Sequence, residues 1–391
     1  MADSQIANGL APRGASRLGV YVHWPYCAKI CPYCDFNVVK ARGGAEPAAL
    51  ARAIVADLEG QARLTGPREL ASVFLGGGTP SLMDPEWAAE IVAAARRLWT
   101  PAADLEVTLE ANPTDAEARA FSDFVQAGVT RLSLGLQSLD DAALRFLGRN
   151  HDAVTAIRAA EAARAAFPRL SLDLIYARPS QTPQVWAEEL RAAIALGAEH
   201  ISPYQLTIEA GTAFDRAVRR GRFALPDPDT GAALFETTQA VLGDAGFEAY
   251  EVSNHARGPA ARSRHNLVYW QGWDYVGAGP GAHGRITAAG VRQATYAAPR
   301  PADYIGQVAH TGVGFAAAEV LTPREAAQER VLSGLRIAEG VARDEVAALN
   351  IPPERIAGLI GLGLLADDPG RLRATPAGRL LLDRLTTELA V

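Results

Sequence analysis

The chain has 391 residues, of which 49% are hydrophobic and 21% are charged, and its formal net charge is −6. This composition excludes an intrinsically disordered chain, and the lack of a net basic charge argues against nucleic acid as a partner. The length exceeds that of one compact domain and suits a barrel-sized domain with a smaller appendage.

The N-terminal residues carry no targeting segment that is easily recognised. Residues 1–19 lack the apolar core of a secretory signal peptide, and no run of about 18 uncharged apolar residues occurs that could span a bilayer. An organellar transit peptide is a weaker alternative, because the acidic Asp3 accompanies the Arg and Ser residues there. We therefore expect a cytoplasmic protein without a transmembrane segment, with residues 1–17 as a flexible N-terminus.

From residue 18 onward, short β-rich runs alternate with longer amphipathic stretches. Strands are expected at Leu18–His23, Leu70–Leu75, Leu105–Leu109, Arg131–Leu136, Leu170–Tyr176 and His200–Leu206. Helices are expected at Glu46–Arg63, Pro85–Leu98, Asp115–Ala127, Asp152–Ala166 and Pro183–Leu196. Six such units predict an α/β fold, a partial (β/α)6 barrel of the TIM type that leaves a lateral opening for a large ligand.

The second half of the chain is less regular. We expect a helix at Asp229–Ala245, a strand at Glu248–Val252, a Gly- and aromatic-rich loop at His265–Arg285 and, after Pro323, two helices and a short hairpin at Gly363–Arg373. That last order is typical of a winged helix, but its basic residues are interleaved with acids, which favours a packing or lid module over DNA binding. The expected divisions are a barrel over 18–250, a connecting region over 251–310 and a C-terminal helical, winged-helix-like domain over 311–391.

All three cysteines of the chain, Cys27, Cys31 and Cys34, follow the first expected strand with the spacing C-x3-C-x2-C. An odd number of cysteines at this spacing does not suit a disulfide framework. Three thiolates on one loop can each hold one iron of a [4Fe–4S] cluster and leave the fourth iron without a protein ligand. A zinc site is the alternative, with His23 as its fourth ligand.

This loop, placed after the first strand of a β/α barrel, resembles that of the radical SAM superfamily. The resemblance implies that S-adenosylmethionine (SAM) chelates the open iron through its amino and carboxylate groups. One electron from the reduced cluster then cleaves SAM to a 5′-deoxyadenosyl radical. Whether this chain cleaves SAM or merely binds it stays open.

Polar groups after the later strands fit a SAM pocket at the face where the strands of a barrel end. The glycines of Gly76–Pro80 allow a ligand close to the backbone, and Glu110 could pair with the SAM ammonium. Gln137 could bond the ribose, and the planar fork of Arg149 suits a carboxylate. Asp173 could accept from a ribose hydroxyl or stabilise a second bound group.

A narrower resemblance extends over residues 17–385. The runs Tyr-Val-His-x-Pro-Tyr-Cys, Cys-Pro-Tyr-Cys-Asp-Phe, Gly-Gly-Gly-Thr-Pro-Ser, Leu-Gly-Leu-Gln-Ser and Arg-His-Asn-Leu-Val-Tyr-Trp are similar to those of the HemW family, relatives of the oxygen-independent coproporphyrinogen III oxidase HemN. By this resemblance, the positions that contact SAM are Tyr21, Tyr33, Gly77, Gly78, Thr79, Glu110, Gln137, Arg149, Asp173 and Gln205.

One departure from HemN affects the expected function. HemN enzymes carry an additional cysteine two positions after the third cluster ligand, and Phe36 stands at that position here. HemN enzymes also have an N-terminal extension over the substrate, which is not expected here. The resemblance therefore implies a haem chaperone that transfers haem to acceptor proteins, with membrane-associated respiratory components as candidates. A radical SAM oxidoreductase acting on a porphyrinogen is the alternative.

The resemblance also implies a haem site in the motif H-N-x-x-Y-W, formed by His265, Asn266, Tyr269 and Trp270. Imidazole is a good axial ligand for haem iron, and flat aromatic side chains suit a porphyrin. The alternative is that His265 has a structural role and the aromatic residues pack against the barrel. His23 and His283 are weaker haem candidates, and His283 could instead line the SAM pocket.

Overall fold

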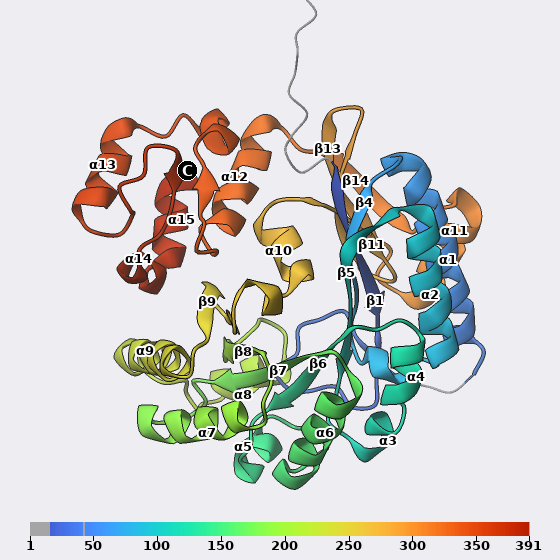
Figure 1. Ribbon diagram of the computed structural model, residues 1–391, viewed down its shortest axis with the longest axis horizontal. Coiled ribbons are helices and arrows are strands. Elements are labelled where there is room, and N and C mark those ends of the chain that lie inside the picture. Colours follow the sequence, from blue (N-terminus) through green and yellow to red (C-terminus); the bar gives the residue numbers. More distant parts are fainter. Residues whose placement is uncertain (1–15, 42–43, 391) are drawn as a thin grey trace, which may run out of the picture.

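The computed structural model describes residues 16–41 and 44–390 and is organised around one twelve-stranded sheet (Figure 1). Its strands are β1 (Arg17–Trp24), β4 (Glu69–Gly77), β5 (Thr100–Ala111), β6 (Arg131–Gln137), β7 (Arg169–Tyr176), β8 (His200–Gln205), β9 (Glu248–Glu251), β10 (Asn254–Ala256), β11 (Asp274–Ala278), β12 (His283–Ala288), β13 (Val291–Ala297) and β14 (Phe315–Val320). The order across the sheet is β14-β13-β12-β11-β1-β4-β5-β6-β7-β8-β10-β9. The strands from β11 to β8 in this order are parallel, and antiparallel strands extend both edges.

The helices of this part of the chain follow the strands in sequence. They are α1 (Glu46–Thr65), α2 (Pro85–Leu98), α3 (Asp115–Ala118), α4 (Phe121–Gln126), α5 (Asp141–Phe146), α6 (Ala153–Ala166), α7 (Pro183–Ala195), α8 (Ala213–Arg219), α9 (Pro228–Asp244), α10 (Arg264–Trp270) and α11 (Pro301–Thr311). The partial barrel and all six of its expected strands are confirmed. Because these strands are parallel, their carboxyl ends lie on one side of the sheet. The expected helix over 115–127 is divided into α3 and α4.

Several helices begin where the sequence predicts because a capping residue precedes a proline. The side chain of Asp84 accepts a hydrogen bond from the backbone of α2 ahead of Pro85, and Thr182 does the same for α7 ahead of Pro183. A proline at the first helical position has no N–H to leave unpaired, and the capping oxygen satisfies one of the remaining donors. These two signals act locally, so the helix starts can be predicted from sequence.

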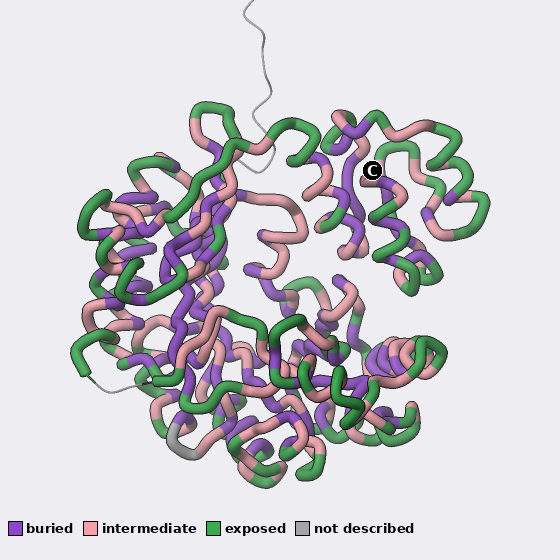
Figure 2. The backbone as a smooth tube through the Cα atoms, turned by 180° about the vertical axis from the view of Figure 1, so that it is seen from behind, coloured by how far each residue is buried: buried purple, intermediate pink, exposed green. Residues whose placement is uncertain are grey.

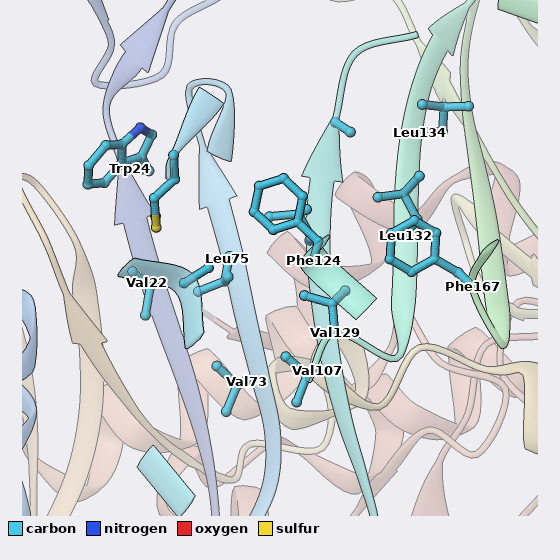
Figure 3. Close-up of a cluster of buried hydrophobic side chains, with 14 of the residues drawn as sticks. Val22, Trp24, Val73, Leu75, Val107, Phe124, Val129, Leu132, Leu134 and Phe167 are labelled. Carbon is cyan, nitrogen blue, oxygen red and sulfur yellow. The ribbon is translucent and has the colours of Figure 1, made fainter. Parts of the chain in front are cut away.

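The main hydrophobic core lies between the strands and the helices that cover them. Val73 and Leu75 of β4 and Val107 of β5 belong to the same cluster as Phe124 of α4, and all four side chains are buried (Figure 3). Buried positions follow the central strands in Figure 2. This layer fixes the strands, and with them the loops at their ends.

The expected loop over 265–285 is wrong, because this segment contains α10, β11 and the start of β12. Its glycines serve close packing between strands. A Cβ atom on Gly277 would lie 2.0 Å from the backbone oxygen of His283, and one on Gly279 would lie 2.2 Å from that of His23. As a result β11 pairs with β1 as a seventh parallel strand, and residues 274–297 extend the barrel sheet.

Helix α10 lies on the inner side of the sheet, between β1, β4 and β5 and the C-terminal helices (Figure 1). Ser263 caps it by accepting a hydrogen bond from the backbone N–H of Asn266, and the N–H of Arg264 donates to Glu106 over 2.8 Å. Glu106 also forms a buried ion pair with Arg131 at 2.8 Å. These contacts hold the start of α10 against the middle of β5.

The C-terminal elements have a hydrophobic core of their own. They are α12 (Pro323–Gly334), β15 (Val341–Ala342), α13 (Pro353–Gly361), β16 (Arg371–Leu372), α14 (Pro376–Leu380) and α15 (Leu382–Ala390). The expected hairpin over 363–373 is present in a short form, because Leu365 and Ala374 form an antiparallel bridge with a backbone hydrogen bond on either side of it. Its second arm contains β16, which also pairs with β15. Within the described ranges, no helix combines the length and apolar composition needed to cross a bilayer.

Residues 1–15 of the expected N-terminal segment 1–17 lie outside the described residues. Strand β1 begins at Arg17.

Candidate functional site

The cysteine loop, residues 25–40, leaves the end of β1 and is held at several points. Its first and last residues pair as the short parallel strands β2 (Tyr26–Cys27) and β3 (Val39–Lys40). The backbone N–H of Cys34 donates to the oxygen of Cys31 over 3.2 Å, and the oxygen of Pro32 accepts from Phe214 over 2.9 Å. The loop is therefore fixed by backbone contacts on both sides of the cysteines.

The three thiols face one cavity of about 440 Å³ at the ends of the parallel strands. This volume falls within the range of ligand pockets, roughly 300–1,000 Å³. Among the described residues, no three His, Cys, Asp or Glu side chains converge closely enough to share one metal ion. Three separate thiols on one loop are compatible with a cluster in which each thiolate binds its own iron.

His23, the expected fourth ligand of the zinc alternative, is not available for metal binding. It is 5% exposed, its Nδ1 is hydrogen-bonded to the hydroxyl of Tyr21 at 2.9 Å, and its Nε2 to the backbone oxygen of Asn37 at 2.8 Å. Tyr21 does not line the cavity and instead stacks on Phe74. The expected contact of Tyr21 with SAM stays a prediction, and Phe74, on which its ring stacks, lines the cavity.

Most of the other expected SAM residues line this cavity together. They are Tyr33, Gly77, Gly78, Thr79, Glu110, Gln137, Arg149, Asp173 and Gln205, and Asn266 of the expected haem motif lines it as well. Tyr33 belongs to the cysteine loop and Asn266 to α10, and the others come from β4 to β8 or from the segments that follow these strands. The structure thus brings together groups that lie more than 170 positions apart in the sequence.

The glycines after β4 are needed for a close approach of two backbones. A Cβ atom on Gly78 would lie 2.8 Å from the backbone of Pro25, and one on Gly77 would lie 2.7 Å from the ring of His23. Gly77 also has φ +112°, a conformation that side chains other than glycine rarely adopt. These glycines therefore allow the end of β4 to pack against the cysteine loop. The backbone N–H of Gly77 donates a hydrogen bond to the carboxylate of Glu110 over 3.0 Å.

Two acidic side chains face the cavity in a way that favours a bound cation. Burial, reinforced by the negative charge of Asp173, raises the pKa of Glu110 to about 8. Burial also raises the pKa of Asp173 to about 6, although its carboxylate accepts a hydrogen bond from Ser133 over 2.8 Å. A positive group placed between them would stabilise both ionised forms. The ammonium and sulfonium of SAM have that charge.

Arg149 connects the cysteine loop to the ends of the strands. Its Nη1 donates to the sulfur of Cys31 over 3.3 Å, and its Nη2 donates to the backbone oxygen of Gly135 over 3.0 Å and to Asn112. Its Nε is buried without a partner among the described residues. An unpaired buried N–H of a guanidinium is a donor for an anionic group such as a carboxylate.

Asn112 is a residue that sequence reasoning did not assign. Its amide donates to the hydroxyl of Thr79 over 3.1 Å and accepts from Arg149, so it links two expected SAM positions. A single amide in the run Glu-Ala-Asn-Pro has no characteristic spacing that would reveal this role. Only its place two residues after Glu110 at a strand end gives a signal.

The four residues of the expected haem motif do not form one ligand-facing surface. His265 is 1% exposed, its Nδ1 is hydrogen-bonded to Ser72 at 2.9 Å, and its Nε2 to Tyr269 at 2.7 Å. Tyr269 and Trp270 line a separate cavity of about 240 Å³ between the barrel and α12. The role of His265 as an axial haem ligand stays a prediction, and it would require one of these two hydrogen bonds to be released.

His283 also lies outside the main cavity. It is exposed at the start of β12, where its ring lies 4.8 Å from that of Tyr296. The expectation that it could line the SAM pocket is wrong.

Replacing His265 by alanine tests the structural role of this side chain. We expect the variant to lose about 1–3 kcal/mol of stability for each buried partner left unpaired, Ser72 and Tyr269, as measured by chemical denaturation. Haem affinity and iron content of the folded protein should not change. Normal stability together with weaker haem binding would restore His265 as a ligand.

Comparison with known proteins gives consistent matches over the whole chain. A model of the radical SAM superfamily matches residues 21–193, and a model of the HemN C-terminal domain matches residues 321–381. The chain is 39% identical to "Heme chaperone HemW" of Mycobacterium tuberculosis over 97% of both chains. It is 40% identical to "Radical S-adenosyl methionine domain-containing protein 1, mitochondrial" of Mus musculus, over 97% of this chain and 89% of that protein.

The solved structure of coproporphyrinogen III oxidase (HemN) from Escherichia coli has a similar fold. It superimposes with a TM-score of 0.78 over 96% of this chain and 90% of that one, at 21% sequence identity. This likeness supports the fold, including the attachment of the C-terminal elements to the barrel.

Proposed function

Since this chain belongs to the HemW family of radical SAM proteins, we propose that it is a haem chaperone that binds a [4Fe–4S] cluster and SAM and passes haem to acceptor proteins. The observation that carries this proposal is the shared cavity: three cysteines, two acidic groups and a buried guanidinium N–H face the same space. The M. tuberculosis relative is a haem chaperone by name, which indicates haem as the cargo.

The donor set fits the cofactors. Cys27, Cys31 and Cys34 would hold three irons, and the cluster would supply an open iron that chelates an amino acid and can donate one electron. Glu110, fixed by the N–H of Gly77, would accept a hydrogen bond from the amino group of SAM. Arg149 would orient its carboxylate.

Gln137 and Asp173 would bind the ribose of SAM. Gln137 ends β6 with φ +66°, which is uncommon for a residue with a side chain and persists only where the surroundings enforce it. Asp173 faces the same cavity from β7. We infer that this strained position directs the amide of Gln137 toward a ligand hydroxyl.

Phe36 favours the chaperone over the oxidase. It occupies the position at which HemN enzymes have an additional cysteine, and its side chain is 63% exposed at the mouth of the cavity. Phenylalanine cannot donate a proton or coordinate a metal. The second candidate, oxidation of a porphyrinogen, therefore lacks one group that the enzyme has.

Incubation of the reconstituted protein with coproporphyrinogen III, SAM and a reductant tests this choice under anaerobic conditions. We expect no protoporphyrinogen beyond one turnover, with HemN as the positive control. In a parallel reaction, haem-loaded protein should transfer haem to a membrane-associated respiratory apoprotein. Repeated turnover of coproporphyrinogen would show that the chain is an oxidase.

A further inference from the structure

A small part of the cysteine loop combines exposed apolar side chains with positive charge. Ile30 and Phe36 are 46% and 63% exposed, and both line the mouth of the cavity. Lys29 lines the same mouth, and Lys40 is exposed beside Cys27 in the β2–β3 pair. We call Lys29, Ile30, Phe36 and Lys40 the loop surface.

The lysines of the loop surface are unusual within this chain. Lys29 and Lys40 are its only lysines, and arginine supplies all the other basic side chains. Among the described residues, neither ammonium has a carboxylate partner. Asp35, exposed next to Phe36, is the only acidic residue of the loop. A protein of net charge −6 therefore places two unpaired, flexible cations beside the cluster cysteines.

The exposure of Phe36 does not come from a loosely held segment. The side-chain amide of the next residue, Asn37, donates to the backbone oxygens of Pro280 and Pro299, each over 2.8 Å. Its own backbone oxygen is hydrogen-bonded to His23. The loop thus presents Phe36 outward from a fixed backbone, and a preorganised surface loses little entropy when a ligand binds.

We propose that haem docks on the loop surface, a proposal that rests on the haem-chaperone function above. Haem is a flat apolar macrocycle with two propionates on one edge. Ile30 and Phe36 would contact its face, and the ammonium groups of Lys29 and Lys40 would pair with the propionates. Exposed apolar groups gathered at one place mark interaction sites, and the charges here complement those of haem.

The location differs from that of the H-N-x-x-Y-W motif. The cavity beside Tyr269 and Trp270 is about 240 Å³, below the range of ligand pockets. Each of the three arginines that line it is already paired with a carboxylate: Arg285 with Glu329, Arg292 with Asp274 and Arg330 with Glu345. The loop surface is open and its cations are unpaired. Haem bound there would lie next to the cluster and SAM, which gives those cofactors a direct means to influence its release.

Titration of the reconstituted protein with haem and with haem dimethyl ester tests this placement. In the double variant Lys29→Gln/Lys40→Gln we expect haem affinity to fall roughly three- to tenfold, because exposed ion pairs contribute modestly. Affinity for the ester, which has no propionate charge, should not change. The double variant Lys29→Arg/Lys40→Arg keeps the charge and should bind haem normally.

Phe36→Ser should weaken binding of both haem and its ester by about tenfold or more, because each loses the same apolar contact. Leu362→Ser is the matched control, since Leu362 is 72% exposed in the C-terminal module. Iron content is measured in every variant, and the lysine variants stay informative if Phe36→Ser loses its cluster.

The outcomes separate the two proposals. If the wild type binds haem and all variants bind it equally well, the loop surface is not the docking site, although the chaperone function stands. The docking proposal also fails, and the chaperone function stands, if the variants bind haem normally but an acidic electron-transfer protein no longer reduces their cluster. That result would assign the loop surface to the electron-transfer partner. If the wild type binds no haem, the proposed function itself fails.

Discussion

Replacing Cys31 by serine is expected to abolish cluster binding. The loop supplies three thiolates for three irons, and a serine hydroxyl is a poor replacement for a thiolate as an iron ligand. Cys31 is also the sulfur that accepts a hydrogen bond from Arg149, so the substitution disturbs the link between the cluster and the expected SAM carboxylate site. After anaerobic reconstitution, the variant should be nearly colourless and contain almost no iron or sulfide.

The neighbouring variant Phe36→Ser controls for disturbance of the loop. It changes an exposed side chain five positions away and leaves all three thiols in place, so it should retain its iron. If Cys31→Ser kept a full cluster, a ligand outside the three cysteines would have to be present.

Replacing Glu110 by glutamine is expected to have the second largest effect, on SAM binding. The substitution keeps the shape of the side chain and removes the charge that would face the SAM ammonium. Loss of one partner from a buried, hydrogen-bonded charge pair costs about 2–4 kcal/mol, or roughly a thirtyfold or greater loss of affinity. Equilibrium dialysis of SAM against the reconstituted protein measures this affinity. The control is Glu188→Gln, because Glu188 is exposed on α7.

The same residue gives the wild type a characteristic pH dependence. Because the pKa of Glu110 is raised to about 8 in the free pocket, its carboxyl group carries a proton below that pH. This proton must leave before the carboxylate can bind SAM. SAM affinity should therefore rise as pH increases from 6 to 8 and then level off, and this rise should largely disappear in Glu110→Gln. A wild-type affinity that falls over this range would contradict the assigned role.

Stability without SAM should change in the opposite direction. A carboxyl group whose pKa is raised in the folded state holds a proton that the unfolded chain has released, so stability falls as pH rises between about 4.5 and 8. The ligand-free Glu110→Gln variant has no such group to ionise. It should therefore be more stable than the wild type at pH 9, although it binds SAM poorly.

The barrel could be predicted from sequence because its signals are local. Apolar runs of strand length and capped prolines such as Pro85 and Pro183 each specify an element without reference to distant residues. The order of those elements then places the strand ends, and with them Glu110 and Gln137, on one face.

Other features could not be predicted, because they depend on partners far away in the chain. Gly277 and Gly279 read as loop residues, yet they are required by the backbones of His283 and His23. Only the folded sheet shows that β11 has a partner in β1. The role of Asn112 could not be predicted either, because it depends on a hydrogen bond from Arg149.

The side chains of the H-N-x-x-Y-W motif do not share one surface, and the reason is geometric. Residues four apart on a helix share a face, so His265 and Tyr269 meet each other inside the barrel. Asn266 follows His265 by one position, about a quarter turn around the helix, and lines the cavity instead. A motif that is contiguous in sequence is therefore divided among different surroundings.

The central claim is that three thiolates hold a cluster whose fourth iron accepts SAM. Electron paramagnetic resonance of the reconstituted, reduced protein, recorded with and without SAM, tests it most directly. We expect the signal of a reduced [4Fe–4S] cluster that changes when SAM is added in the wild type, and changes far less in Glu110→Gln. A protein that takes up no iron, or a cluster whose signal is indifferent to saturating SAM, would contradict it.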